Sequence, residues 1–415
     1  MNKKNIDKLL ESLFAKTRLG IKPGLERSRI LDQEISFPHK YYKNIHIAGT
    51  NGKGTVASIL TSYLMEKGFK VGLYTSPHLN IFNERIRVNG EMISDDEIIS
   101  IYELIEDKSE EIGATFFEIT STIAFQHFKN SGVDYAVIET GMGGRFDSTN
   151  IITPELSIIT SISMDHEEYL GSSIKNIAKE KAGIIKKNGH CIYSATDTEV
   201  RYEIESIALK QDATTFNIVN STEFHSHSRN GRLSFIINGV VINTPFIGKY
   251  QMENISIVLQ TINRLFDGID ENILNKSLAK LKENTGYSSR IELISNEPII
   301  LRDVGHNPAA FQSLKDTISE AFPNQNFNIV FGVMHDKNID DMIRIIKPIC
   351  KKLILTQVGN ERSMKVEILE EIAKKNRIDY ISFKNSKEAY DYALELNEAT
   401  LVCGSFYLIG EIFSD

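Results

Sequence analysis

The sequence predicts an α/β fold of two domains, and three observations support this prediction. Apolar segments of strand length alternate with amphipathic helical segments over most of the chain, as in folds built on a largely parallel sheet. The length of 415 residues exceeds what one domain usually holds. The polar, glycine-bearing segment Glu283–Ser289 interrupts the alternation and is the best linker candidate. We therefore expect one domain over residues 1–285 and a second over residues 286–415.

The expected first domain begins with an amphipathic helical segment and continues as a strand–helix–strand unit. A short apolar strand is expected at 44–48 and the next at 70–75. The helix between them carries its apolar residues on one face, and Gly68 ends it. These apolar residues are Val56, Ile59, Leu60, Tyr63 and Leu64. Further strands are expected at 135–138, 156–160 and 191–193.

The region Phe216–Phe246 departs from the alternation. It carries Asn-Gly pairs at 230–231 and 238–239 between β-rich runs, which is the strongest short-range signal for hairpins. We expect a small antiparallel addition at the end of the first domain, followed by a helix over 254–266.

The second domain is expected to be a smaller, Rossmann-like α/β domain. About 125 residues are enough for one such compact domain. Its strands are expected at 299–303, 328–331, 353–356, 379–383 and 400–403, with helices between them.

Composition excludes several classes of protein. The net charge is −8 and no long basic run occurs, which argues against nucleic acid and anionic membrane surfaces as main partners. No apolar stretch approaches the roughly 20 residues of a membrane helix, and the N-terminal segment lacks the apolar core of a signal peptide. Cys191, Cys350 and Cys403 are widely spaced and indicate neither a disulfide framework nor a zinc site. We expect a cytoplasmic protein.

The segment Ala48–Thr55 (AGTNGKGT) predicts a phosphate-binding loop between the first strand and its helix. Glycines let backbone N–H groups point inward, and the helix N-terminus adds partial positive charge. The candidate nucleotide contacts are Asn51, Gly52, Lys53, Gly54 and Thr55, with Lys53 reaching the phosphates and the Thr55 hydroxyl touching Mg²⁺. The spacing departs from a standard Walker A motif. A tight turn with an exposed lysine is the alternative, but the flanking strand and helix favour ATP binding.

Other candidate residues follow the strands at their carboxyl ends, where open α/β sheets bind ligands. Ser76 in TSPHL could bind a metal or substrate, although a simple proline turn is the alternative. Glu139 ends a strand and could hold Mg²⁺ through its carboxylate oxygens. Arg145 and Asp147 follow on a glycine-rich loop and are candidates for substrate binding. A salt-bridged loop brace is their alternative role.

Two residues have open interpretations on spacing alone. His166 follows a strand and stands beside an aspartate, so a functional and a structural role are equally favoured. Lys181 lies on a helix, where spacing alone predicts a solvated surface lysine.

In the second domain, the segment RDVGHNP places Asp303 and His306 on a turn after the first strand. Pro308 could open the following helix. Arg290 lies close to this segment along the chain. If both domains close on one nucleotide, these residues can complete the site from the far side.

Together these motifs resemble the Mur ligase superfamily and, within it, the folylpolyglutamate synthase/dihydrofolate synthase family. The phosphate loop matches the family's sequence motif. Further segments resemble other family motifs and occur in the same order, over nearly the whole chain. These are SPHL and ERIRVNG (84–90), FFEITS (116–121), the E-x-G-x-G-G-R-x-D-x-T-N run from Glu139, DH (165–166), EKAGI (180–184), D-x-x-HNP (303–308) and GSFYLIGE (404–411). The ordered set is highly specific.

The resemblance implies an ATP-dependent ligase. ATP phosphorylates a folate or pteroate carboxylate, and the amine of L-glutamate displaces the phosphate to form an amide. The resemblance also implies two magnesium sites, with Ser76, Glu139 and His166 as ligands and Lys181 carboxylated by CO₂ to a carbamate.

For the remaining positions, the resemblance implies contacts with the nucleotide and the pterin ring. It implies ATP contacts at Asn254 and, in the second domain, at Arg290, Asp303 and His306. It places Thr115, Phe116 and Phe117 at the pterin pocket, where core packing is the alternative. The family's usual form is a monomer.

Two departures from the family pattern bear on function. The family's PGR before the second domain is SSR here, so Arg290 remains but the proline does not. Lys22 and Pro23 stand where bifunctional members have an acidic residue, which favours polyglutamylation over dihydrofolate synthesis. Two alternatives stay open: a Mur-type ligase with another acceptor, and a nucleotide-gated switch protein without a ligase step.

Overall fold

The computed structural model describes residues 3–17, 24–218, 226–229, 232–237 and 239–414. These residues divide into two compact units. The first comprises Met1–Ser163, Glu167–Glu223 and Glu253–Tyr287, and the second comprises Met164–His166, Phe224–Met252 and Ser288–Asp415. The boundary expected between residues 285 and 286 stays a prediction. The departure at Lys22 and Pro23 lies outside the described residues.

The first unit is built on an eight-stranded sheet in the order β4-β3-β2-β5-β1-β6-β7-β8. The strands from β2 to β8 in this order run parallel, and β3 and β4 form an antiparallel edge. The expected mostly parallel sheet is therefore confirmed. The strands are β1 Lys43–Ala48, β2 Val71–Tyr74, β3 Ile86–Val88, β4 Glu91–Met92, β5 Tyr135–Glu139, β6 Leu156–Ile159, β7 His190–Tyr193 and β8 Thr214–Asn217.

Several helices of this unit begin at a residue whose side chain caps them. Ser94, Asp197 and Asp270 each accept a backbone N–H in the first turn of the helix that follows. The helices are α1 Lys3–Thr17, α2 Glu26–Glu34, α3 Lys53–Glu66, α4 Asp95–Glu103, α5 Glu106–Glu111, α6 Phe116–Ser131, α7 Glu167–Leu170, α8 Ile174–Ala182, α9 Thr198–Lys210, α10 Gln251–Phe266, α11 Glu271–Ala279 and α12 Leu281–Thr285, with short 3₁₀ turns η1 Pro38–Lys40, η2 Phe82–Arg85 and η3 Ser148–Ile151.

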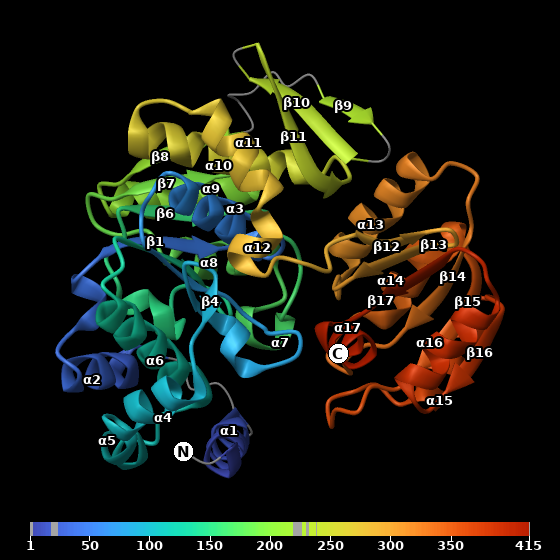
Figure 1. Ribbon diagram of the computed structural model, residues 1–415, viewed down its shortest axis with the longest axis horizontal. Helices are drawn as coiled ribbons and strands as arrows, with labels where there is room; N and C mark the ends of the chain where they lie inside the picture. The colour runs from blue at the N-terminus through green and yellow to red at the C-terminus, as the bar shows by residue number, and fades with distance from the viewer. Residues whose placement is uncertain (1–2, 18–23, 219–225, 230–231, 238, 415) are drawn as a thin grey trace. The chain divides into compact units, whose positions relative to one another are not determined.

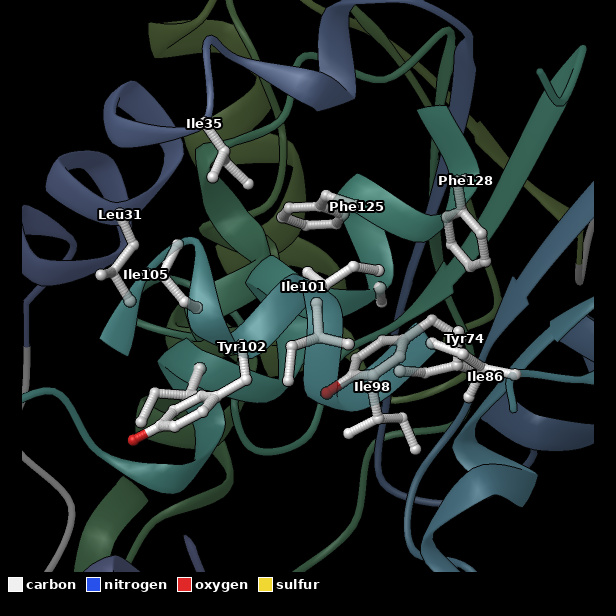
Figure 2. Packing of buried hydrophobic residues seen from close by; sticks show 14 of the residues in the cluster. Leu31, Ile35, Tyr74, Ile86, Ile98, Ile101, Tyr102, Ile105, Phe125 and Phe128 are labelled. Carbon is white, nitrogen blue, oxygen red and sulfur yellow. The ribbon is translucent and has the colours of Figure 1, made fainter. Parts of the chain in front are cut away.

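The main core of the first unit lies where α2, α4 and α6 gather beside the sheet (Figure 1). Figure 2 shows how this cluster packs, with Ile98 and Ile101 of α4 near Tyr74 of β2, and Phe125 of α6 beside them. Phe125 is fully buried. Truncating such a phenylalanine to alanine typically costs about 3–5 kcal/mol. This core fixes the strands whose carboxyl ends carry the candidate site.

A three-stranded antiparallel sheet in the order β11-β10-β9 supplies the expected antiparallel addition. Its strands are β9 Ser226–Arg229, β10 Arg232–Ile237 and β11 Val240–Ile247. It groups with the second unit by its contacts. Phe216 does not belong to it, because β8 pairs in parallel with β7. The turn residues Asn230, Gly231 and Asn238 lie outside the described residues.

The second unit contains a six-stranded sheet in the order β12-β13-β17-β14-β15-β16. All neighbours run parallel except β12, which pairs antiparallel with β13. Sequence analysis missed β12 because this edge strand buries none of its residues fully. The strands are β12 Glu292–Asn296, β13 Ile299–Asp303, β14 Phe327–Phe331, β15 Cys350–Thr356, β16 Tyr380–Phe383 and β17 Thr400–Cys403. The helices are α13 Pro308–Ala321, α14 Ile339–Ile346, α15 Val366–Lys375, α16 Ser386–Glu395 and α17 Phe406–Phe413, with the 3₁₀ turn η5 Lys347–Ile349.

Within the described part of the chain, every helix is too short or too polar to span a lipid bilayer.

Candidate active site

Four neighbouring parallel strands of the first unit, β2, β5, β1 and β6, deliver candidate residues to one edge of the sheet. Ser76 follows β2, Glu139 ends β5, and the phosphate-loop segment 49–54 follows β1. The segment Thr160–Ser163 follows β6. Since ligands of open α/β sheets bind beyond the carboxyl ends of parallel strands, this edge is the candidate site.

The phosphate-loop segment is tied to the residues that follow β6. The Thr50 amide donates to the Ser161 carbonyl over 2.7 Å, and the Thr160 hydroxyl donates to the Asn51 carbonyl over 2.7 Å. The Thr50 hydroxyl also donates to the Ser163 carbonyl over 3.0 Å. These bonds hold the loop backbone in place before any ligand arrives, so little ordering would be needed on binding.

Gly52 shows why this loop tolerates no side chain at that position. Its φ of +90° lies in the region that favours glycine, and an added Cβ would stand 2.2 Å from the Asn254 Oδ1 atom. Asn254 is buried and lies on α10. The Asn254 side chain therefore packs directly against Gly52, the glycine that precedes Lys53.

Lys53 bends its side chain back over the loop. Its Nζ donates to the carbonyl oxygens of Gly49 and Thr50, over 3.1 and 3.2 Å. The same nitrogen lies 3.9 Å from the Glu139 carboxylate, which also accepts the Ser76 amide over 3.2 Å. The structure thus brings Lys53, Ser76 and Glu139 together around the end of β5.

Lys181 is 3% exposed, so the interpretation from spacing as a solvated surface lysine is wrong. Its Nζ donates to the Gly49 carbonyl over 2.7 Å, beside the bond from Lys53. Close packing of glycines brings helix α8 this near. A Cβ on Gly183 would stand 2.4 Å from the Arg145 Cβ, and one on Gly144 would stand 2.8 Å from the Glu180 carbonyl oxygen.

The donor set at this edge suits a hard cation. The Glu139 carboxylate and the hydroxyls of Ser76 and Thr55 are oxygen donors of the kind that Mg²⁺ prefers. Among the described residues, no group of three or more His, Cys, Asp or Glu side chains could hold a metal. A magnesium ion here would therefore take most of its ligands from water and phosphate oxygens, as is usual in phosphate-binding sites.

Asp147 braces the glycine-rich turn that follows β5. Its carboxylate is buried and accepts the amides of Met142 and Thr149, over 2.9 and 3.0 Å. Burial raises the pKa of this carboxyl, although these hydrogen bonds oppose the rise. Arg145 pairs with Glu180 instead. Both residues serve as the loop brace that was the alternative role, and their substrate contacts stay predictions.

The segment Thr115–Phe117 opens helix α6, and its three residues differ in exposure. Thr115 is buried, and its amide donates to Glu118, which anchors the helix start. Phe116 is 2% exposed and stacks against Phe14 with ring centroids 5.2 Å apart. Phe117 is half-buried and lies close to Gly141. Phe116 therefore has the core-packing role left open above, and Phe117 faces the glycine-rich turn.

His78 and Arg85 form a further pair at this edge that sequence analysis did not single out. The Arg85 Nε donates to the His78 Nδ1 over 2.8 Å, which requires the ring to be neutral at that nitrogen. Burial, together with the Arg85 charge, lowers the pKa of His78 to about 3. Arg85 also lies 5.3 Å from the Phe116 ring centroid. The SPHL motif thus carries a histidine that stays uncharged.

In the second unit, candidate residues follow β13, β17 and β14, which are neighbours in the sheet. Asp303 is buried and accepts the amides of Ile291 and Gly305, over 2.9 and 2.7 Å. Burial raises the pKa of this carboxyl, although the Arg290 charge opposes the rise. The Arg290 guanidinium lies 5.0 Å from the Phe406 ring centroid.

Asp165, in the short segment that groups with the second unit, is the centre of a polar cluster. Its carboxylate lies 2.9 Å from the Lys337 Nζ and accepts the Asn307 side-chain amide over 3.0 Å. The nearest ring nitrogens of His306 and His166 lie 3.8 and 3.9 Å away. Burial raises the pKa of this carboxyl, but the surrounding cationic groups outweigh it and hold the pKa well below its usual range.

The structure thus distributes the candidate residues over both units. His166, Arg290, Asp303 and His306 belong to the second, and the remaining candidates belong to the first. Sequence analysis missed Asn307, Lys337 and Phe406. Each lies in a segment that follows a strand of the second sheet, so the rule that found Glu139 could have found them.

Comparisons with known proteins identify both parts of the chain. Residues 47–262 match the Mur ligase middle domain, and residues 289–406 match the Mur ligase glutamate ligase domain. The dihydrofolate synthase/folylpolyglutamate synthase of Bacillus subtilis is 32% identical, covering 96% of this chain and 96% of its own. The Escherichia coli protein of the same name is 28% identical, covering 97% and 93%.

Solved structures agree with these matches. The folylpolyglutamate synthase of Mycobacterium tuberculosis, complexed with ADP and AMPPCP, gives a TM-score of 0.89 at 27% identity, covering 98% of this chain and 97% of its own. The Escherichia coli FolC structure with DHPP and ADP gives 0.85 at 27% identity, covering 97% and 96%. The family resemblance and the fold expected from the motifs are confirmed.

Proposed function

Because the chain belongs to the Mur ligase family and is an ATP-dependent ligase, we propose that it joins L-glutamate to dihydropteroate, to reduced folates, or to both. The γ-phosphate of ATP moves to the acceptor carboxylate, giving an acyl phosphate and ADP. The glutamate amine then attacks the acyl carbon, the C–O bond to phosphate breaks, and the amine loses a proton. An amide and inorganic phosphate result.

One observation carries this proposal: two lysines converge on the Gly49 carbonyl at the strand-end edge that also holds Glu139. The Lys53 ammonium beside a helix N-terminus suits the polyphosphate of ATP, and Lys181 is held at the same edge. Lys53 would neutralise charge that develops on the transferred phosphoryl group. Since the protein does little covalent chemistry in such a transfer, positioning and charge neutralisation supply the catalysis.

Magnesium fits the first unit's edge through Glu139 and Ser76, and when bound it would neutralise phosphate charge. We propose a second site that draws on His166 and on a carbamate of Lys181. In forming the carbamate, the neutral Lys181 amine adds to CO₂ and releases one proton. The buried position of Lys181 supports this, because a carbamate would be shielded there from bulk water.

The remaining candidates are assigned by the same logic. Asn254 would contact the nucleotide beside Gly52, and Arg290, Asp303 and His306 would contact ATP from the second unit. Phe117 would stack on the pterin ring, since it is half-buried where Phe116 is packed in the core. We propose that the chain acts as a cytoplasmic monomer on small molecules, with domains 1–285 and 286–415.

The deciding experiment measures phosphate release with ATP, Mg²⁺ and L-glutamate, with dihydropteroate or tetrahydrofolate as acceptor. Activity with both would establish a bifunctional enzyme, and activity with tetrahydrofolate alone a dedicated folylpolyglutamate synthase. A Mur-type ligase with another acceptor would be active with neither. ATP binding without any glutamate-dependent phosphate release would contradict the ligase assignment.

A further inference from the structure

Tyr287, within the linker segment Glu283–Ser289, contacts the phosphate-loop helix directly. Its hydroxyl oxygen lies 3.3 Å from the Thr55 Oγ1 atom, and both residues belong to the first unit. Thr55 is 3% exposed and lies in the first turn of α3. Tyr287 has no assigned role among the candidate residues above, although it touches one of the nucleotide contacts.

This contact is the last of several that run along one face of α3. Thr55, Ser62 and Glu66 are spaced by seven and then four residues, so their side chains line one side of the helix. The Asn284 side-chain amide donates to Ser62 over 2.9 Å and to Glu66 over 3.2 Å. Lys276 lies 2.6 Å from Glu66. The segment from α11 to Tyr287 therefore follows α3 from its C-terminal end back to the phosphate loop.

The backbone before Tyr287 is also fixed. Gly286 ends α12 with a φ of +70°, and a Cβ there would stand 2.6 Å from an Arg87 guanidinium nitrogen. The Tyr287 amide donates to the Thr285 hydroxyl over 3.3 Å. Because the Gly286 conformation and the Tyr287 amide hydrogen bond both fix the backbone, the Tyr287 phenol reaches Thr55 from a defined direction.

From this geometry we propose that Tyr287 is a positioning residue for the nucleotide, acting through the hydroxyl of Thr55. The inference rests on the proposed function, because it requires ATP at the phosphate loop. A threonine hydroxyl has one proton to donate and two lone pairs. When the phenol donates to Thr55, the threonine proton is left for a phosphate oxygen. A donated hydrogen bond also polarises the next one in the chain and strengthens it.

The test is ADP·Mg²⁺ binding by calorimetry to four proteins: wild type, Tyr287→Phe, Thr55→Val and the double variant. A neutral hydrogen bond of ordinary strength predicts that Tyr287→Phe weakens ADP binding about threefold to tenfold. In the Thr55→Val background the same change should have almost no effect, because the partner hydroxyl is gone. Tyr202→Phe, on the exposed face of α9, is the matched control and should bind as the wild type does.

A second measurement uses the absence of tryptophan from the sequence. Tyr287→Trp introduces a single tryptophan beside Thr55, and its emission should change as ADP·Mg²⁺ saturates the protein. The emission of Tyr202→Trp should not change. This readout needs no catalysis and remains available if removing the phenol lowers stability.

The outcomes separate the two claims. If the wild type binds no ADP, the proposed function fails and the inference fails with it. If the wild type binds ADP and Tyr287→Phe binds it within twofold, only the inference is overturned. An undiminished effect of Tyr287→Phe on ADP binding in the Thr55→Val background overturns the inference too. The same holds if the emission of Tyr287→Trp does not change as ADP·Mg²⁺ saturates the protein.

Discussion

The two units place their candidate residues at the same kind of position, the carboxyl ends of parallel strands, but with opposite charge arrangements. In the first unit, two lysine ammonium groups are held by the Gly49 carbonyl oxygen. In the second, the Asp165 carboxylate is held by Lys337, Asn307 and histidine rings. The closest contacts of Lys53 at the first edge are backbone carbonyl oxygens, with the Glu139 carboxylate farther away at 3.9 Å, so a polyphosphate can recruit its ammonium group. At the second edge, the Asp165 carboxylate is already paired with side chains of the same unit.

The largest expected effect tests the cationic edge of the first unit. Lys53→Met should lower the turnover number for phosphate release by about 1,000-fold, because it removes a charge aimed at the transferred phosphoryl group. Its thermal unfolding temperature should change little, since the lost contacts are two bonds to backbone oxygens and a 3.9 Å ion pair with Glu139. Steady-state kinetics with saturating ATP measures the effect. Turnover within tenfold of the wild type would show that Lys53 does not contact the phosphates.

The first edge was also the easier one to predict from sequence. A glycine-rich turn between an apolar strand and a helix constrains the backbone. The residues Gly49–Thr55 therefore predict the local loop geometry without knowledge of the rest of the fold. Glu139 and Ser76 followed from the rule that strand ends carry sites. These inferences need only local pattern and strand order.

Other features could not be predicted because they depend on tertiary contacts. The burial of Lys181 depends on how closely Gly144 and Gly183 let α8 approach, and a helical period does not encode that distance. The cluster at Asp165 joins side chains from segments more than 100 residues apart, each of an ordinary residue type. The strand β12 was missed since its half-exposed residues lack a strong apolar pattern.

The second prediction compares two lysines of helix α8, the buried Lys181 and the exposed Lys179. Lys181→Ala should reduce turnover at least about 100-fold, since it removes either a cation or, as a carbamate, a metal ligand. Lys179→Ala, on the exposed side of α8, should stay within twofold. Carbon-13 NMR with labelled CO₂ distinguishes the two states of Lys181, because only the carbamate gives a new carbonyl signal, absent from Lys181→Ala. Equal activity of the two variants would remove Lys181 from the site.

The third prediction tests the internally satisfied edge of the second unit. Asp165→Asn should destabilise that unit by about 3 kcal/mol at pH 7, because the buried Lys337 ammonium loses its nearer carboxylate and keeps only Asp336, at 3.5 Å. Since the folded-state pKa of Asp165 is lowered, its contribution is present above about pH 4 and is lost as the pH falls further. Urea unfolding at pH 7 and pH 3 measures both values.

The control for this pair is Lys337→Met/Asp165→Asn, which removes both charges. It should recover part of the stability lost in Asp165→Asn, because the buried ammonium that lost its nearer carboxylate is removed as well. If Asp165→Asn were as stable as the wild type at pH 7, the Asp165–Lys337 ion pair would not stabilise the second unit. The contrast with the first edge would then be wrong.

The smallest effect concerns histidines that stay neutral at the two edges. Burial lowers the pKa of His78 to about 3, with Arg85 adding to the shift, and lowers that of His306 to about 4, with Lys337 adding to it. Below pH 6.5 the unfolded chain therefore binds more protons than the folded one, so stability falls as the pH falls. For His78 alone the loss between pH 7 and pH 5 should be about 2 kcal/mol.

His78→Asn should remove this part of the pH dependence, because the amide oxygen can accept the Arg85 hydrogen bond but takes up no proton. Denaturant unfolding at pH 7, 6 and 5 should give a shallower decline than in the wild type, with the control His335→Asn, an exposed position, leaving the slope unchanged. A slope equal to the wild type's would mean that His78 is protonated as readily in the folded chain as in the unfolded one. The Arg85 contact would then be made by a different ring nitrogen or lost in solution, and the SPHL segment would not hold a neutral histidine at the first edge.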